Sequence, residues 1–171
     1  MFLLVKIPYL TILLFFLFLS LSTAYAETLV GRVVRIADGD TVTVLDSSNK
    51  QRKIRLMGID APEKSQAYGT RSKQHLSDLV FDKQVTIYYN KQDKYGRTVG
   101  KILVNGIDAN LEQVKSGLAW HYKRYEIEQT PEDRVRYADA EVDARNAKHG
   151  LWADRNPIPP WEFRKMNKHR N

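Results

Sequence analysis

Alternating apolar and polar residues in the first half of the chain predict β-strands. In the stretch 41–45, Val42 and Val44 fall on one face while Thr41 and Thr43 fall on the other, which is the two-residue period of a strand with one buried face. A glycine-containing turn at 38–40 and a polar turn at 46–50 flank this stretch. Five strands are predicted in all, at residues 29–36, 41–45, 53–59, 84–89 and 97–104.

A longer period of three to four residues predicts three α-helices. Residues 70–81 place Leu76, Leu79 and Val80 on one face, and a shorter helix around Leu111 is stopped by Gly117. The third helix has a capping Thr130 followed by Pro131, is expected to reach about residue 148, and is followed by Gly150 as its stop signal. Its buried face is expected to carry Val135, Ala138 and Val142.

These elements predict one α+β domain over residues 27–152. Five short strands in a partly open barrel are the plan of the OB-fold, which commonly binds nucleic acid. The order of the elements fits this plan, and the pattern leaves the strand pairing open. We therefore expect an OB-fold, a five-stranded β-barrel with three α-helices.

The first 26 residues are interpreted as a secretory signal peptide. They carry one charge, Lys6, an apolar run from residue 9 to 21, and the triplet Ala24-Tyr25-Ala26. The run is shorter than the roughly 20 residues of a spanning helix, and the triplet is typical of a cleavage site. We expect cleavage after Ala26, only transient contact with the membrane, and a secreted or periplasmic protein. The alternative is an uncleaved membrane anchor.

Composition and charge narrow the chemistry further. The chain has 27 Lys and Arg against 20 Asp and Glu, a net charge of +7, which favours polyanionic partners such as nucleic acid. It has no cysteine, which excludes disulfides, thiolate chemistry and cysteine zinc sites. No pair of its four histidines has metal-ligand spacing, so they are interpreted as surface or hydrogen-bonded side chains.

Residues 153–171 form a Pro-rich, basic C-terminal tail. The favoured interpretation is an extended surface segment that packs through Trp161, because runs of charge are usually solvated. The alternative is an electrostatic arm for nucleic acid. The bases of such an arm are Arg164, Lys165, Lys168 and Arg170.

Five charged residues of the domain could together cleave a phosphodiester bond. Asp40 closes a turn and Asp60 ends the third predicted strand, so both can reach one rim of a small barrel. Carboxylates together with a carbonyl are oxygen ligands suited to Ca²⁺ or Mg²⁺. Glu63 could orient or deprotonate a water, and Arg55 and Arg97 could each bind a phosphate through two N–H groups. Taken singly, each residue also fits an ordinary turn or surface position.

Three motifs carry these residues in a fixed order: Asp-Gly-Asp-Thr at 38–41, Arg-Leu-Met-Gly-Ile-Asp-Ala-Pro-Glu at 55–63 and Asp-Lys-Tyr-Gly-Arg at 93–97. Together with Gly-Leu-Ala at 117–119 and Gly-Leu-Trp at 150–152, they resemble the staphylococcal (micrococcal) nuclease family, also called thermonucleases. The resemblance covers most of residues 28–152. It implies a five-stranded OB-type barrel and a Ca²⁺-dependent endonuclease. Such an enzyme cuts DNA and RNA with little sequence specificity and leaves 3′-phosphate ends.

The resemblance also implies roles for single residues. Asp40 and Asp60 match the family's Ca²⁺-binding carboxylates, and Ala61 occupies the position that gives the ion a backbone carbonyl. Glu63 matches the proposed general base. The phosphate-binding arginines are matched by Arg55 and Arg97, residues near the nucleotide by Lys94, Tyr95 and Tyr125, and supporting residues by Asp38 and Thr41.

Two departures from the family concern substrate affinity. Lys123 stands where the prototype has a nucleotide-facing tyrosine, and the stretch 64–69 is shorter than the prototype's loop. Ca²⁺ in preference to Mg²⁺ follows from the resemblance, as does a monomer that acts on DNA and RNA without a stable protein partner. Two other hypotheses remain: a non-catalytic OB-fold module that binds nucleic acid, and a basic envelope protein anchored by its leader.

Overall fold

The computed structural model describes residues 27–168, and its long strands close into a barrel. β1 (Glu27–Ile36), β2 (Thr41–Asp46) and β3 (Gln51–Leu56) form an antiparallel meander. β5 (Gln84–Gln92) pairs with β1 and with β6 (Thr98–Val104), and a parallel pairing of β6 with β3 closes the ring. The predicted signal peptide and Arg170 lie outside the described residues.

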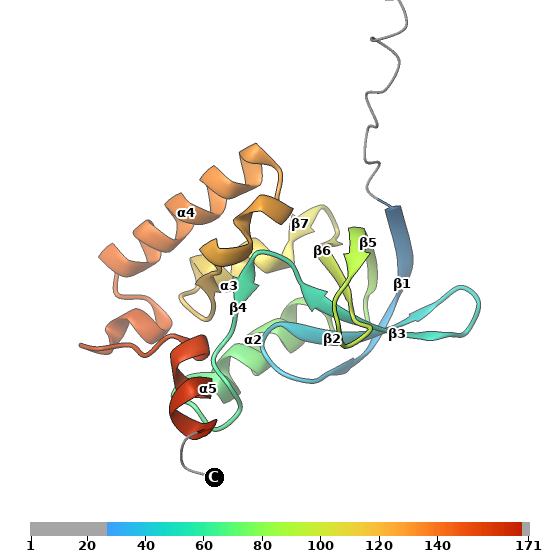
Figure 1. Ribbon diagram of the computed structural model, residues 1–171. Helices are drawn as coiled ribbons and strands as arrows, with labels where there is room; N and C mark the ends of the chain where they lie inside the picture. The colour runs from blue at the N-terminus through green and yellow to red at the C-terminus, as the bar shows by residue number, and fades with distance from the viewer. Residues whose placement is uncertain (1–26, 169–171) are drawn as a thin grey trace, which may run out of the picture.

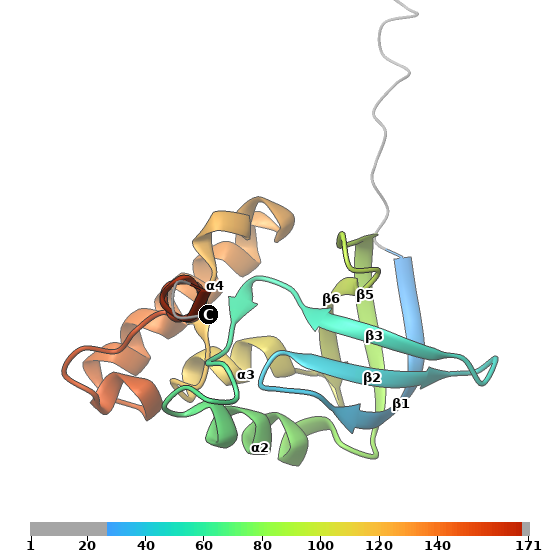
Figure 2. The same cartoon turned by 60° about the horizontal axis from the view of Figure 1, so that its bottom comes forward.

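The predicted α+β class and five-stranded barrel are confirmed. Figures 1 and 2 show the long strands gathered on one side of the molecule and the helices on the other. The helices are α2 (Gly69–Val80), α3 (Ala109–Lys115), α4 (Pro131–Asn146) and α5 (Pro160–Lys168). Short elements complete the fold: β4 (Ile59–Asp60), β7 (Ile107–Asp108), β8 (Trp120–His121) and the 3₁₀ helices η2 (Lys123–Glu128) and η3 (Gly150–Ala153). Among the described residues, no helix is both long and apolar enough to span a membrane.

The third predicted strand, 53–59, is two strands with a turn between them. β3 ends at Leu56, and Gly58 adopts a φ of +76°, where a Cβ would lie 2.4 Å from the Gln129 side chain. A residue with a side chain would therefore be strained and crowded at this point. The chain leaves the barrel here, and β4 pairs with β8 instead, which sets Asp60 opposite Trp120.

The predicted buried face of the last domain helix was wrong. Val135 and Val142 are 60% and 53% exposed. The side of α4 that packs inward carries Tyr137, Ala140 and Ala144, together with the buried acids Asp133 and Glu141. Those acids form ion pairs with Lys101 and Lys123. The packed face is therefore partly polar, and the helical period of apolar residues does not show in the sequence. The helix ends at Asn146, two residues before the predicted end, and Gly150 begins η3.

Residues 160–168 of the C-terminal tail form the helix α5, where an extended segment was predicted. Its predicted packing through Trp161 is confirmed, because the indole joins a cluster formed by Trp120, Leu151 and Trp152. Figure 2 shows β4 leading from the end of β3 toward α5. The tail therefore lies beside the segment that carries Asp60.

Gln113 of α3 connects two helices to the turn at residues 38–40. Its fully buried amide donates from Nε2 to the Gly39 carbonyl at 2.6 Å and to the Ser72 carbonyl at 3.0 Å. Its Oε1 lies 2.5 Å from Nδ1 of His75 on α2. Gly39 packs so closely that a Cβ would lie 1.9 Å from Ser72 Oγ. This network fixes the turn that delivers Asp40.

Replacing Gln113 with Leu keeps the volume but removes the only donor to the Gly39 carbonyl among the described residues and a second donor to the Ser72 carbonyl, which lies within α2. We expect the free energy of unfolding to fall by about 2 to 4 kcal/mol, because buried polar groups lose their partners. Urea denaturation measures this change. The matched control is Gln74→Leu on the exposed face of α2, which should change stability by less than about 0.5 kcal/mol. Equal effects of the two substitutions would contradict the structural role of Gln113.

Candidate active site

A cleft of about 730 Å³ collects the residues that the sequence singled out. Ten of the eleven predicted site residues line it. The exception is Thr41, which does not line the cleft. Its hydroxyl donates to Asp40 Oδ1 at 3.0 Å, which agrees with its predicted supporting position. The cleft holds Asp38, Asp40, Asp60, Glu63, Arg55 and Arg97, so anionic and cationic side chains converge in it.

Arg55 joins the two predicted metal-binding carboxylates. Its Nη1 lies 3.0 Å from Asp40 Oδ2, and its Nη2 lies 3.1 Å from Asp60 Oδ1. All three side chains are nearly buried, with 14%, 9% and 2% of their areas exposed. Buried acids at this spacing would repel each other, and the guanidinium between them offsets that repulsion.

The register of the barrel places Asp40 next to Arg55. Thr41 of β2 pairs with Arg55 of β3, and the Leu56 amide donates to the Asp40 carbonyl at 2.8 Å. The Asp40 carboxylate also accepts from the Ala61 amide at 2.8 Å. One side chain therefore ties together the turn before β2 and the segment after β4, which are twenty-one residues apart.

Burial changes the titration of two acids in the cleft. Burial and, to a smaller extent, the negative charge of the neighbouring Asp40 raise the pKa of the Asp38 carboxyl to about 6. Burial also raises the pKa of Asp60 above its usual range, although hydrogen bonds from Arg164 oppose that shift. A cation bound nearby would lower the pKa of such an acid, because it stabilises the charged form.

A tight turn before β6 presents Arg97. The Asp93 carboxylate accepts from the amides of Tyr95 and Arg97 at 2.9 and 3.0 Å and from Arg97 Nε at 2.7 Å. Burial would raise the pKa of Asp93, but the hydrogen bonds from Arg97 lower it on balance. The Nε of Arg97 donates to Asp93, whereas its two terminal nitrogens have no hydrogen-bond partner among the described residues. These terminal nitrogens are therefore available to a ligand.

The predicted nucleotide-side residues lie at the open edge of the same cleft. Tyr95 is 72% exposed, with Lys94 Nζ 5.0 Å and Arg97 Cζ 5.5 Å from its ring centre. Tyr125 is 43% exposed and contacts Tyr122 edge-on at 5.1 Å. These aromatic and basic side chains can contact a base or a phosphate.

Sequence reasoning missed Arg164 of α5 in this cleft. Its Nη2 donates to Asp60 Oδ2 at 2.7 Å, and its Nη1 donates to Asp60 Oδ1 at 3.2 Å and to Glu63 Oε1 at 2.7 Å. Burial would lower the pKa of the guanidinium, but these hydrogen bonds raise it on balance. In the sequence, Arg164 was one of four tail bases, and no role in the site was assigned to it.

Comparison with known proteins agrees with this geometry. Residues 53–154 match the family described as staphylococcal nuclease homologues. The chain is 44% identical over 155 residues to an "uncharacterized endonuclease" of Haemophilus influenzae, an alignment that covers 91% of this chain and 84% of that protein. It is 39% identical over 148 residues to a "micrococcal nuclease" of Shigella flexneri, with 81% and 82% covered. The chain belongs to the staphylococcal nuclease family.

The two departures from the family prototype have structural counterparts. Lys123 turns away from the cleft and pairs with Glu141 of α4 at 3.0 Å, while its neighbour Tyr122 lines the cleft. The short stretch after Glu63 is tied to the tail, because Gln66 Nε2 donates to the Ile158 carbonyl at 2.6 Å. The tail thus packs against the shortened loop.

The acids retain capacity to hold a metal ion. Each carboxylate oxygen can accept in two directions. Asp40 Oδ1 accepts from Thr41, and Asp60 Oδ2 accepts from Arg164, which leaves one direction on each oxygen. The described residues contain no group of three or more His, Cys, Asp or Glu arranged for a metal. An ion here would therefore rest on two carboxylates, the Ala61 carbonyl and water, a donor set that suits a hard cation such as Ca²⁺ or Mg²⁺.

Proposed function

We propose that this member of the staphylococcal nuclease family is a Ca²⁺-dependent endonuclease acting on DNA and RNA. One observation carries the proposal: acids able to hold a cation and arginines able to hold a phosphate line a single cleft. The names of the two bacterial relatives point the same way. A module that only binds nucleic acid would gain nothing from these carboxylates, because they repel a polyanion unless a cation lies between them.

The roles of the two arginines follow from the N–H groups that each has available for the substrate. Arg97 has its terminal N–H groups available and would take the scissile phosphate through two of them. Arg55 has most of its donors committed to Asp40, Asp60 and the Leu56 carbonyl, and its remaining N–H groups would complete the clamp. The hydrogen bonds from both arginines become stronger as negative charge grows on the phosphate oxygens in the transition state.

Water attack would be assisted by Glu63. Its carboxylate accepts from Arg164 through Oε1, and its Oε2 is available to orient a water or to receive its proton. When bound by Asp40, Asp60 and the Ala61 carbonyl, Ca²⁺ would supply a Lewis acid for a phosphate oxygen. Departure of the 5′-oxygen would leave a 3′-phosphate end, as in the family. Since contacts to phosphate carry no sequence information, cutting should be largely non-specific.

The location of the protein is part of the proposal. An apolar leader ending in Ala24-Tyr25-Ala26 supports export to the periplasm or the medium. β1 begins at Glu27, the residue that cleavage would leave first. N-terminal sequencing of protein recovered outside the cytoplasm should start at Glu27, whereas a start at Met1 would reject cleavage.

Chelation of divalent ions should abolish cutting of single- and double-stranded DNA, and Ca²⁺ should restore it. Ca²⁺ should also raise the thermal midpoint, because an ion at 100 times its Kd stabilises the folded state by about 2.7 kcal/mol. Asp60→Asn should lose this Ca²⁺-induced shift. Asp46→Asn, which changes a carboxylate at the opposite end of β2 held by Arg52, should keep it. Wild-type protein that cuts equally well in chelator would overturn the metal requirement.

Arg97→Lys should lower kcat/KM by about two powers of ten, because an ammonium cannot donate two parallel hydrogen bonds to the phosphate. The matched control is Arg52→Lys. Arg52 also donates from Nε to an aspartate that accepts backbone amides, at 3.0 Å against 2.7 Å for Arg97, but it lies outside the cleft. Steady-state cleavage of a fluorescent oligonucleotide measures both variants. An equal loss in both would assign the effect to stability instead of phosphate binding.

A further inference from the structure

The carboxylate of Glu63 is held in place by the C-terminal helix. Among the described residues, Arg164 is the only group that hydrogen-bonds to this carboxylate, at 2.7 Å. Glu63 is otherwise positioned through its backbone, whose amide donates to Gln66 Oε1 at 3.2 Å. With 40% of its area exposed, the side chain would choose among several rotamers without the arginine. One contact from a distant part of the chain therefore decides where the carboxylate points.

The same guanidinium connects Glu63 to Asp60. Arg164 grips both oxygens of Asp60 and, through Nη1, one oxygen of Glu63. A planar guanidinium fixes the directions of its hydrogen bonds, so the two carboxylates have a set separation and orientation. These hydrogen bonds leave Asp60 Oδ2 able to accept one more hydrogen bond or metal contact, and they leave Glu63 Oε2 without any partner among the described residues. The contact is thus compatible with a bound ion and an ordered water.

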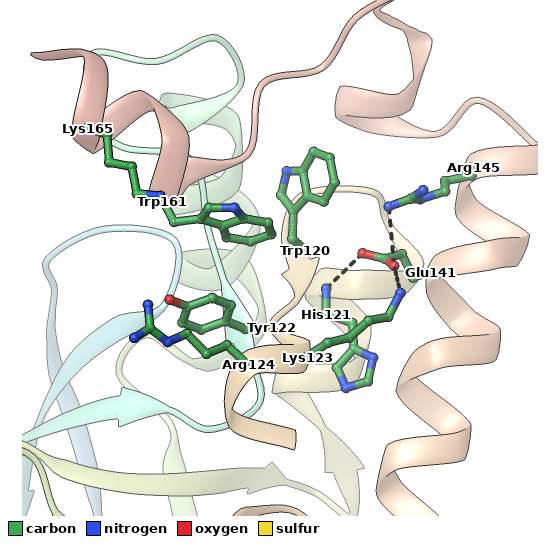
Figure 3. A pocket seen from close by; sticks show the side chains of 9 residues that line it. All are labelled: Trp120, His121, Tyr122, Lys123, Arg124, Glu141, Arg145, Trp161 and Lys165. Carbon is green, nitrogen blue, oxygen red and sulfur yellow. Dashed lines mark hydrogen bonds and ion pairs between the residues drawn. The ribbon is translucent and has the colours of Figure 1, made fainter. Parts of the chain in front are cut away.

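An aromatic anchor holds α5 at the position that this contact requires. Figure 3 shows Trp161 lying over Tyr122 and beside Trp120. The Trp161 and Tyr122 rings are stacked with centres 5.1 Å apart, and Trp120 meets Trp161 edge-on at 5.5 Å. Arg164 follows Trp161 by three residues and so lies on a neighbouring side of the helix. The anchor fixes one turn of α5 and thereby aims the arginine at Asp60.

A second connection joins the tail to the Glu63 segment directly. Gln66 accepts from the Glu63 amide and donates to the Ile158 carbonyl at 2.6 Å. Pro160, which begins α5, is buried. The short loop after Glu63 and the start of α5 therefore form one unit, so the helix is integrated with the cleft wall.

We propose that Arg164 is a positioning residue of the nuclease site, and that α5 is a working part of the active site. Arg164 holds the Glu63 carboxylate beside Asp60, in the orientation that water attack needs. The proposal rests on the proposed nuclease function. It assigns to the C-terminal tail a purpose that its composition did not reveal.

The test compares Arg164→Ala and Arg164→Lys with Lys165→Gln, which removes one positive charge from the same helix. Arg164→Ala should lower kcat about 10- to 100-fold, because misplacement of a reacting group by about 1 Å costs up to that factor. Its KM should stay within about threefold, since the arginine acts through Glu63 and not on the substrate. Arg164→Lys should recover part of the loss by supplying one charged hydrogen bond. Lys165→Gln should leave kcat unchanged.

Trp161→Ala is a second route to the same effect. Loss of the anchor should lower kcat much as Arg164→Ala does, and the double variant should lose little more, because residues acting through one contact are not additive. Thermal midpoints of all variants report whether the barrel stays folded. The Ca²⁺ affinity, read from the Ca²⁺-induced shift of that midpoint, should change by less than about tenfold in Arg164→Ala because Asp60 keeps Arg55.

Three results would overturn the proposal. An unchanged kcat in folded Arg164→Ala would show that Glu63 needs no such support. A rise in KM alone would make Arg164 a substrate contact. A gain in Ca²⁺ affinity of more than about tenfold would show that Arg164 competes with the ion for Asp60. If the wild-type protein cuts no nucleic acid, the nuclease function and this role fail together, whereas an active wild type with an equally active variant rejects Arg164 alone.

Discussion

Repulsion between buried carboxylates is the constraint on which this structure depends. Asp40 and Asp60 lie nearly out of water at one rim of the barrel, where two negative charges repel each other strongly. Arg55 lies between them from within the sheet, and Arg164 approaches Asp60 from the tail. These guanidinium groups offset the repulsion, so the two acids can lie close together.

The barrel supplies the rigid part of that arrangement. Parallel pairing of β3 with β6 closes the sheet and brings the end of β3 near the turn that carries Arg97. Antiparallel pairing of β2 with β3 fixes Asp40 beside Arg55. The remaining parts come from outside the barrel: β4 carries Asp60, and α5 carries Arg164. The site therefore combines a stiff sheet with segments that are positioned by hydrogen bonds and aromatic packing.

The tail packs against the short loop that follows Glu63. Gln66 bonds that loop to Ile158, and Trp161 seats the helix on Tyr122 and Trp120. The first contact joins residues 92 positions apart in the chain, and the second joins residues about 40 positions apart, which makes the C-terminal helix part of the domain. The tail therefore contributes Arg164 to the wall of the cleft.

Local patterns in the sequence predicted four of the five barrel strands, α2 and α3, and ten of the residues that line the cleft, but not the division of residues 53–59 into β3 and β4. Strand alternation and glycine turns act over a few residues, and the three motifs carry their side chains at fixed spacing. Tertiary packing alone decided the rest. The buried face of α4 follows Tyr137 and Ala140 because ion pairs make buried acids acceptable there. Arg164 differs from the other tail bases because Trp161 packs on Trp120 and Tyr122, which are distant in sequence, and this packing places Arg164 beside Asp60. Contacts between distant segments leave no periodic trace, and this is why the sequence did not reveal that residue.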